Sequence, residues 1–220
     1  MSMKNVNEKW LDKDQVRTRY IYYGVKRVFD FVASFLALIV LSPVFLVVAL
    51  CIKSEDWRGP VMYSQIRLGI DGRKFKMYKF RSMVVDADAK IKNLLDKNEV
   101  DGAMFKMKED PRITKVGKFI RKYSLDELPQ LYNVLIGDMS LVGPRPPLTR
   151  EVKEYTDYDK QRLLVQPGCT GLWQVSGRNA LGFSEMVELD LNYIEHSSVM
   201  FDIIILFKTV KIMIIPNDAY

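Results

Sequence analysis

The chain has 220 residues, of which 48% are hydrophobic and 27% are charged. This composition is typical of a chain that folds around a core and argues against intrinsic disorder. Lysine and arginine number 33 against 27 acidic residues, which gives a formal net charge of +6. A basic balance of this kind favours an anionic partner, and it does not select among nucleic acid, an anionic membrane surface and a phosphorylated substrate.

Cysteine and histidine are scarce: the chain holds Cys51, Cys169 and the single histidine His196. Two widely separated cysteines argue against a disulfide framework, and the absence of a Cys or His cluster argues against a zinc site. A bound metal would therefore have oxygen ligands, which favours Mg²⁺. We expect both cysteines to be small buried hydrophobic residues and His196 to lie at the surface or at a helix end.

Residues 1–27 predict an N-terminal surface segment, and an apolar run of about 25 residues follows from Val28 to Ile52. The run is long enough for a bilayer, but it is too long and begins too far into the chain for a secretory signal. Ser42-Pro43 interrupts it, because proline removes one backbone hydrogen bond and clashes with the preceding turn. In lipid, a serine or a neighbouring helix must then bind the carbonyl that is left free.

Positive charges flank the apolar run on both sides, so they do not distinguish its two ends. Both ends satisfy the preference of lysine and arginine for the cytoplasmic side if the helix enters the membrane, bends at Ser42-Pro43 and returns. We therefore favour a re-entrant membrane helix over residues 28–52. A kinked single span and a buried core helix of a soluble protein remain as alternatives.

Two strands separated by a turn are predicted after the apolar run. Residues 60–67 and 73–80 have the composition of strands, and Gly69-Ile70-Asp71-Gly72 supplies the turn of a small β-hairpin. In the second strand Phe75 and Met77 alternate with Lys74 and Lys76, so one face of this strand is predicted to be basic.

Two further segments are helical in pattern. An apolar stripe over residues 116–123 faces lysines and predicts an amphipathic helix, which lies either on an anionic membrane surface or on the protein core. Residues 199–215 are very apolar but carry Asp202, Lys208 and Lys211, which favours an interfacial or core-packed helix over a span. The predicted fold class is α+β, mostly helical, with residues 53–220 as one domain.

Asp126 and Glu127 form the most distinctive pair of acids. Ser124-Leu125-Asp126-Glu127 has the spacing of a capping box, which places both acids in the first turn of a helix. They then serve either the helix terminus alone or a reaction, since the helix dipole keeps a carboxylate ionised there. The bases near them in sequence favour phosphate chemistry, in which one carboxylate is a nucleophile and the other binds Mg²⁺. These bases are Lys79, Arg81, Arg112, Arg121, Lys122, Arg145 and Arg150.

Prolines on both sides of Arg145 make residues 143–147 a stiff segment, which lowers the entropy lost when the arginine binds an anion. A structural turn with an incidental arginine explains the same residues equally well. Residues 168–171 and 176–179 are predicted as glycine-containing loops around an apolar stretch, and short loops of this kind are a weak signal for ligand binding.

Several blocks in the same order resemble one known family, the bacterial polyprenyl-phosphate phosphoglycosyl transferases of the monotopic sugar transferase group, in a short form. The likeness runs from Lys26 to about Val210. The matching blocks are the apolar run with Ser42-Pro43, residues 78–83 (YKFRSM), 124–130 (SLDELPQ), 137–146 (GDMSLVGPRP) and 170–179 (TGLWQVSGRN). The sequence departs from the family at Cys169, where an aliphatic residue is usual, and over residues 195–200.

The resemblance implies a transferase that moves a sugar 1-phosphate from a UDP-sugar to undecaprenyl phosphate, releases UMP and starts the assembly of a cell-surface glycan. It implies a covalent phosphosugar on aspartate, an Mg²⁺ cofactor, and a site on the cytoplasmic face of the bacterial inner membrane. Residues 53–220 would then be the catalytic sugar transferase domain. The sugar itself is left open, as is the oligomeric state.

The roles that the resemblance implies fall on matching positions of this chain. Asp126 corresponds to the nucleophile, Glu127 to an Mg²⁺ ligand, and Ser42-Pro43 to the break of the membrane helix. The phosphate- and substrate-binding residues implied by the family are Lys79, Arg81, Arg121, Arg145, Arg178 and Asn179.

A basic membrane-attached binding or scaffolding protein without catalysis is the alternative, in which Asp126 and Glu127 only cap a helix. A nucleic-acid-binding protein is disfavoured, because the sequence holds no base-reading motif and the apolar run would have no purpose.

Overall fold

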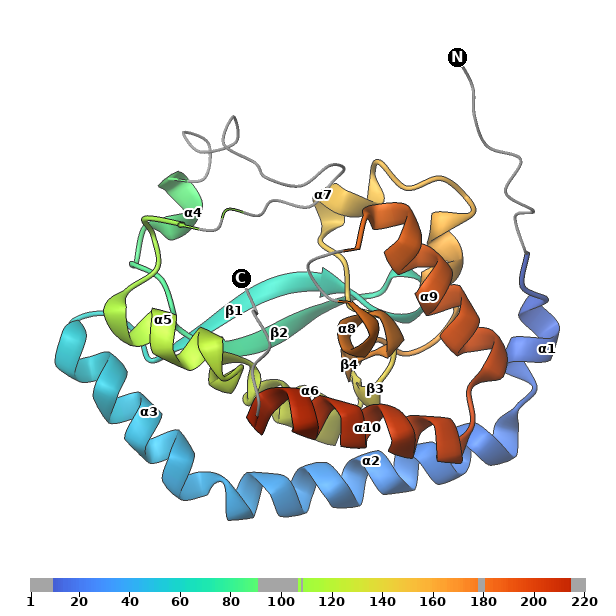
Figure 1. The fold of residues 1–220 in the computed structure, drawn as a ribbon, viewed down its shortest axis with the longest axis horizontal. Coiled ribbons are helices and arrows are strands. Elements are labelled where there is room, and N and C mark those ends of the chain that lie inside the picture. Colours follow the sequence, from blue (N-terminus) through green and yellow to red (C-terminus); the bar gives the residue numbers. More distant parts are fainter. Residues whose placement is uncertain (1–9, 91–106, 108, 178–180, 215–220) are drawn as a thin grey trace.

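The protein is described by a computed structural model that places residues 10–90, 107, 109–177 and 181–214. The first half contains α1 (Lys13–Arg17), α2 (Tyr20–Val40), α3 (Ser42–Glu55), β1 (Met62–Leu68), η1 (Ile70–Gly72), β2 (Lys74–Phe80) and α4 (Ala87–Lys90), where η marks a 3₁₀ helix. The second half contains α5 (Lys115–Lys122), η3 (Leu125–Glu127), α6 (Gln130–Ile136), β3 (Ser140–Val142), α7 (Thr149–Val152), η4 (Asp159–Leu164), β4 (Gly168–Thr170), α8 (Leu172–Ser176), α9 (Phe183–His196) and α10 (Val199–Ile214). The predicted fold class is confirmed in its coarse form, since helices dominate and the sheets are small (Figure 1).

The apolar run forms two helices that meet at the predicted break. α2 and α3 are separated by Leu41 and are bent by 59° relative to one another. Pro43 has no N–H to donate to the carbonyl of Ile39 four residues earlier, and the hydroxyl of Ser42 donates to that carbonyl at 2.8 Å. The expectation that a serine binds the freed carbonyl is confirmed.

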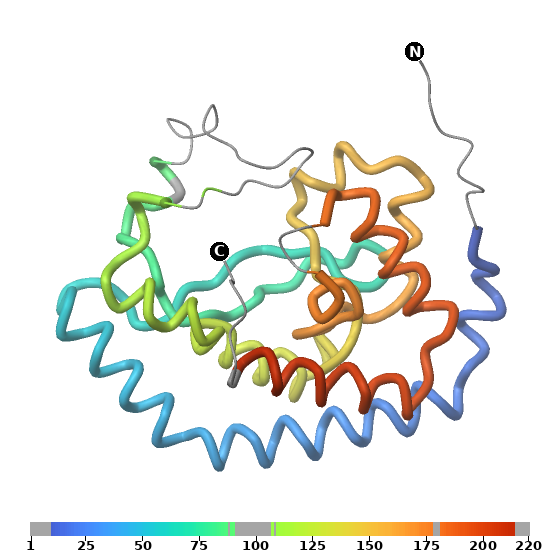
Figure 2. Tube along the Cα trace, viewed as in Figure 1, coloured from blue at the N-terminus to red at the C-terminus, as the bar shows by residue number. Residues whose placement is uncertain are grey.

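The bent pair lies along one side of the whole domain, as the continuous tube in Figure 2 shows. α2 contacts α6, β3 and α10, whereas α3 contacts α5. Arg27 on α2 donates to the carbonyls of Val134 and Leu135 at the end of α6, at 2.6 and 2.8 Å. At the other end, the carboxylate of Glu55 accepts hydrogen bonds from the first two amides of α5. Both halves of the bent pair are thus fixed to the domain.

In the part of the chain that the structure describes, no single helix is both long and apolar enough to cross a membrane, but α2 and α3 together are. Many of their large apolar side chains are exposed, among them Phe35 and Leu36 on α2 and Leu46, Val47 and Leu50 on α3. A continuous exposed apolar surface of this kind is typical of an interaction with a membrane or a partner. The re-entrant path through a bilayer and the division at residues 27/28 and 52/53 stay predictions.

The predicted hairpin is confirmed as the antiparallel pair β1 and β2, with Tyr63 opposite Lys79 and Arg67 opposite Phe75. The turn places Asp71 at φ 54° and Gly72 at φ 74°, which explains the glycine at the second position. Phe75 and Met77 are buried on the inner face, and Lys74 and Lys76 are exposed on the other face, as the alternation predicts.

A second sheet contradicts the prediction of a loop over residues 168–171. Gly168–Thr170 forms β4, which pairs in parallel with β3, and the apolar stretch after it is the helix α8. The two backbones approach so closely that a Cβ on Gly143 would lie 2.5 Å from the carbonyl oxygen of Gln166. The glycines therefore serve close backbone packing, which a sequence pattern does not separate from a flexible loop.

α5 packs its buried Ile120 against Val48 and Ile52 of α3, so this amphipathic helix lies on the protein core, while its Phe119 is 60% exposed. α10 likewise buries Ile205 and exposes Phe207. His196 ends α9 with an exposed side chain, as expected. Cys51 is exposed rather than buried, which corrects the expectation for this residue.

Replacing Ser42 by alanine should lower the free energy of unfolding by about 1 kcal/mol, because the Ile39 carbonyl loses the hydroxyl that compensates for Pro43. Thermal unfolding in one detergent would measure the loss. Ser54→Ala is the matched control, since the Ser54 hydroxyl donates to the Cys51 carbonyl at the same 2.8 Å within uninterrupted helix. Equal losses in the two variants would contradict a special role for Ser42.

Candidate active site

Asp126 and Glu127 lie on the short 3₁₀ helix η3, between α5 and α6. The capping box predicted for them is wrong, because Ser124 adopts a left-handed conformation (φ 55°) and its side chain makes no capping hydrogen bond. α6 begins only at Gln130, after Pro129. The positive φ at Ser124 reverses the chain between α5 and η3, and this turn brings the two acids against β2.

Asp126 is 8% exposed. Burial raises the pKa of its carboxyl from 3.8 to about 6, the charge of Lys79 opposes this rise, and the neighbouring Glu127 adds to it. Burial, and not a helix dipole, therefore dominates the pKa of Asp126. Asp126 is still largely ionised at neutral pH.

Glu127 is held by an ion pair with Lys79, whose Nζ donates to Oε1 at 2.5 Å. Its side chain is 41% exposed. Desolvation works to raise the pKa of Glu127, but Lys79, Arg145 and Arg121 outweigh it, and the pKa is lowered. The two acids therefore differ: one is buried and easily protonated, and the other is accessible and firmly anionic.

Three of the predicted cations act on this pair. Lys79 and Arg121 lower the pKa of Asp126, and Lys79, Arg121 and Arg145 lower the pKa of Glu127. The structure therefore brings together groups from β2, the end of α5 and the proline-flanked segment, as the phosphate hypothesis requires.

Arg67 is a further cation near the acids that the sequence reasoning did not propose for the site. It is 5% exposed, and its guanidinium donates to the carbonyl of Pro146 at 3.1 Å and to Gln65 at 2.8 Å. Burial and the charge of Arg145 lower the pKa of Arg67 to about 10, although Glu151 and Glu127 oppose the change. The register of the predicted hairpin could have identified Arg67 as a site residue, because it places Arg67 and Lys79 on the same face.

Arg81 has a different partner from the one proposed for it. Its guanidinium pairs with Asp56 at 2.5 Å and also donates to the backbone carbonyl of Asp56, just after α3. This contact ties the end of α3 to the end of β2. Arg178 and Asn179 lie outside the described residues, and their roles stay predictions.

Among the described residues, no group of three or more His, Cys, Asp or Glu side chains has the arrangement of a metal site. Mg²⁺ does not need such a group, because it keeps several waters and binds through one or two carboxylates together with substrate phosphates. The exposed carboxylate of Glu127, with Asp126 beside it in sequence, fits that donor set.

The arrangement suits chemistry on an anionic phosphorus centre. Four cations interact with Asp126, Glu127 and the neighbouring Glu151, so positive charges outnumber negative charges at the site. That excess favours bound phosphate oxygens. The buried carboxylate of Asp126 is shielded from water, which makes an aspartate a stronger nucleophile than it is in solution.

Comparison with known proteins yields one family. A family model described as bacterial sugar transferase matches residues 21–216. The galactosyl transferase CpsE of Streptococcus agalactiae is 47% identical over 202 residues, which are 91% of this chain and 44% of that protein. The undecaprenyl-phosphate galactose phosphotransferase of Salmonella typhimurium is 48% identical over 200 residues, which are 89% of this chain and 42% of that protein.

The chain thus spans less than half the length of these two relatives. The exopolysaccharide production protein ExoY of Sinorhizobium fredii is closer in size. It is 40% identical over 199 residues, which are 89% of this chain and 88% of that protein.

Replacing Asp126 by asparagine should make stability less dependent on pH. A carboxyl whose pKa is raised by folding contributes stability below its unfolded pKa of 3.8, and this contribution is lost as the pH rises through about 6. Relative to wild type, Asp126→Asn should therefore gain about 2–3 kcal/mol between about pH 4 and about pH 7.5. Denaturant unfolding at both pH values would measure the difference, and a constant difference would contradict the raised pKa.

Proposed function

The chain belongs to the bacterial sugar transferase family, and from this premise we propose that it transfers a sugar 1-phosphate from a UDP-sugar to undecaprenyl phosphate and releases UMP. The observation that carries the proposal is the buried Asp126, set beside an exposed Glu127 and among cations. A helix cap requires neither the burial nor the surplus of positive charge.

The names of relatives support the substrate classes. One is an undecaprenyl-phosphate galactose phosphotransferase, and another, from Komagataeibacter xylinus, is an undecaprenyl-phosphate glucose phosphotransferase that is 43% identical to this chain. Because both sugars occur among relatives of similar identity, the sugar of this protein is left open. The likeness to the exopolysaccharide production protein ExoY supports a role in exopolysaccharide production.

In the first step of the proposed reaction, a carboxylate oxygen of Asp126 attacks the β-phosphorus of the UDP-sugar. The bond between that phosphorus and the bridging oxygen breaks, and UMP leaves with the bridging oxygen and its electron pair. Asp126 then carries the sugar phosphate as an acyl phosphate. No general base is needed, because the carboxylate is largely ionised above a pKa of about 6.

In the second step, a phosphate oxygen of undecaprenyl phosphate attacks the same phosphorus. The bond to the Asp126 oxygen breaks, its electron pair returns to the carboxylate, and the lipid diphosphate sugar is released. Both steps exchange one phosphorus–oxygen bond for another. Most of the rate gain is therefore expected from positioning and from charge neutralisation.

The cations contribute differently to positioning and charge neutralisation, depending on where they lie. Lys79 fixes Glu127 and offsets the charge of Asp126. Arg121 and Arg145 hold phosphate oxygens, and Arg67 adds a buried positive charge next to Arg145.

Mg²⁺ is proposed as the cofactor, with Glu127 as its protein ligand. When bound, it supplies neutralisation of the diphosphate charge. Glu127 is suited to hold it, because its pKa is lowered and its side chain remains accessible.

The bent pair α2 and α3 is proposed to enter the bacterial inner membrane from the cytoplasmic side and return to it. The exposed apolar residues and the 59° bend at Ser42-Pro43 support this path. It keeps the site at an interface that both a soluble nucleotide sugar and a lipid phosphate reach.

UMP release from a panel of UDP-sugars with undecaprenyl phosphate and Mg²⁺ tests the function directly. With the active sugar and no lipid, mass spectrometry should find a phosphosugar on Asp126. Asp126→Asn should lose turnover by at least about a thousandfold, because an amide cannot form the acyl phosphate. Asp157→Asn, which alters an exposed acid paired with Lys160, is the control. Turnover that persists in Asp126→Asn would refute the covalent mechanism.

Lys79 and Arg81 come from the same strand but should behave differently. Lys79→Met should lower kcat by about a hundredfold, because Glu127 loses its partner inside the site and Asp126 loses a charge that offsets its burial. Arg81→Met should mainly lower Tm, since it frees Asp56 at the end of α3. Measuring kcat and Tm for both variants separates the two roles. A large loss of kcat at unchanged Tm in Arg81→Met would restore Arg81 to the phosphate site.

A further inference from the structure

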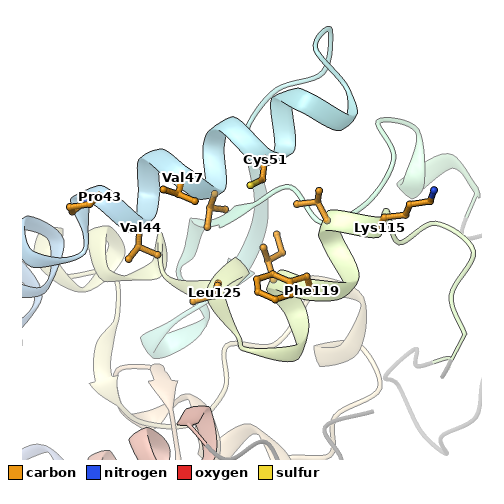
Figure 3. Close-up of a pocket in the computed structure, with 10 residues that line it drawn as sticks. Pro43, Val44, Val47, Cys51, Lys115, Phe119 and Leu125 are labelled. Atoms are coloured by element: carbon orange, nitrogen blue, oxygen red, sulfur yellow. The ribbon is translucent and has the colours of Figure 1, made fainter.

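A groove of about 600 Å³ separates α3 from α5 and η3 (Figure 3). Its walls are almost entirely apolar. Its lining includes Val44, Val47 and Cys51 on α3, Val116 and Phe119 on α5, and Leu125 on η3, and Lys115 at the start of α5 is its charged residue.

The groove borders the short helix η3, which carries the proposed nucleophile. Leu125 lies at its floor, where Figure 3 shows it across from Val44, and Leu125 directly precedes Asp126 in the chain. The base of the groove is firm, because Leu125 packs in one cluster with the buried Val48 and Ile120. An apolar chain in the groove would therefore lie against η3, the short helix that also carries Asp126.

The protein leaves the sides of this groove exposed. Val47 is 59% exposed, Phe119 is 60% exposed, and Cys51 is exposed as well. Exposed apolar side chains on both walls of one cavity are typical of a site for an apolar ligand. One wall is also α3, which belongs to the bent pair that is apolar enough to enter a bilayer.

We propose that this groove binds the isoprenoid chain of the acceptor lipid, with the chain units nearest the phosphate against Leu125. The inference rests on the proposed function. The acceptor must bring its phosphate to Asp126, and its chain is joined to that phosphate, so the first units of the chain need an apolar path that starts beside η3. The groove between α3 and α5 is such a path.

The groove orients the acceptor more than it attracts it. Inside a bilayer, moving a hydrocarbon chain from lipid to an apolar groove gains little, because the two surroundings are similarly apolar. What the groove supplies is a fixed direction of approach for the phosphate oxygen, which lowers the entropy lost in the second step.

Cys51 provides a test that does not depend on turnover. The chain has only one other cysteine, Cys169, so peptide mass spectrometry separates the two sites. In detergent micelles, undecaprenyl phosphate at ten times its Kd should slow the reaction of Cys51 with a maleimide about tenfold. Phosphatidylglycerol, which has the same charge but acyl chains, and inorganic phosphate should not. Unchanged labelling, or equal protection by phosphatidylglycerol, would overturn the proposal.

Two tryptophan variants on α3 complete the test. Val47 lines the groove and Leu46 does not, although their exposed fractions are similar at 59% and 62%. Val47→Trp should raise KM for undecaprenyl phosphate about tenfold relative to KM for the UDP-sugar, and Leu46→Trp should leave this ratio unchanged. Equal changes in the two variants would indicate general membrane contact and overturn the groove site. Wild-type protein that releases no UMP from any UDP-sugar would instead refute the proposed function.

Discussion

The missing N–H of Pro43 is the constraint on which the arrangement of this protein depends. α2 contacts α6, β3 and α10, and a helix that continued straight after Val40 would not turn towards α5. The 59° bend instead turns α3 towards α5, where Glu55 accepts from the first amides of that helix. The bend is tolerated because the Ser42 hydroxyl binds the Ile39 carbonyl. The helix that supplies the apolar surface is thereby also the helix that positions α5 and, through it, the acids of η3.

The same cations explain both the stability and the chemistry of the site. Burying Asp126 disfavours its charged form, and Lys79 and Arg121 offset part of that penalty. The charged form of Glu127 is easier to keep, because the side chain is partly exposed to water and is paired directly with Lys79. In the proposed reaction the same cations bind phosphate oxygens, so the groups that make a buried carboxylate tolerable are those that a phosphoryl transfer requires. With a pKa of about 6, the Asp126 carboxyl is largely ionised at neutral pH. Its raised pKa also means that the carboxylate is more basic, and so more nucleophilic, than an ordinary aspartate.

In the proposed reaction a polar nucleotide sugar and an apolar lipid phosphate meet at this site, and the fold offers each of them a different side of η3. The polar side is built from the inner face of the hairpin and the segment around Arg145, with Arg67 buried between them. The apolar side is the groove between α3 and α5. Leu125 and Asp126 are consecutive residues and belong one to each side. A three-residue 3₁₀ helix thus forms the boundary between a charged pocket and a surface suited to lipid.

The sequence alone determined the features that depend on neighbouring residues: the apolar run, its break at Ser42-Pro43 and the hairpin. Each follows from a local rule, such as proline's missing donor or the alternation of a strand. Tertiary structure decided the rest. The capping box fails because Ser124 takes a positive φ, the pKa of Asp126 rises because distant elements bury it, and Arg81 turns to Asp56 rather than to the acids. Lys79 and Glu127 pair across 48 positions of sequence. Burial of a side chain and the choice of its ion-pair partner depend on how distant elements pack. A local sequence pattern therefore does not predict which acidic and basic residues form a pair.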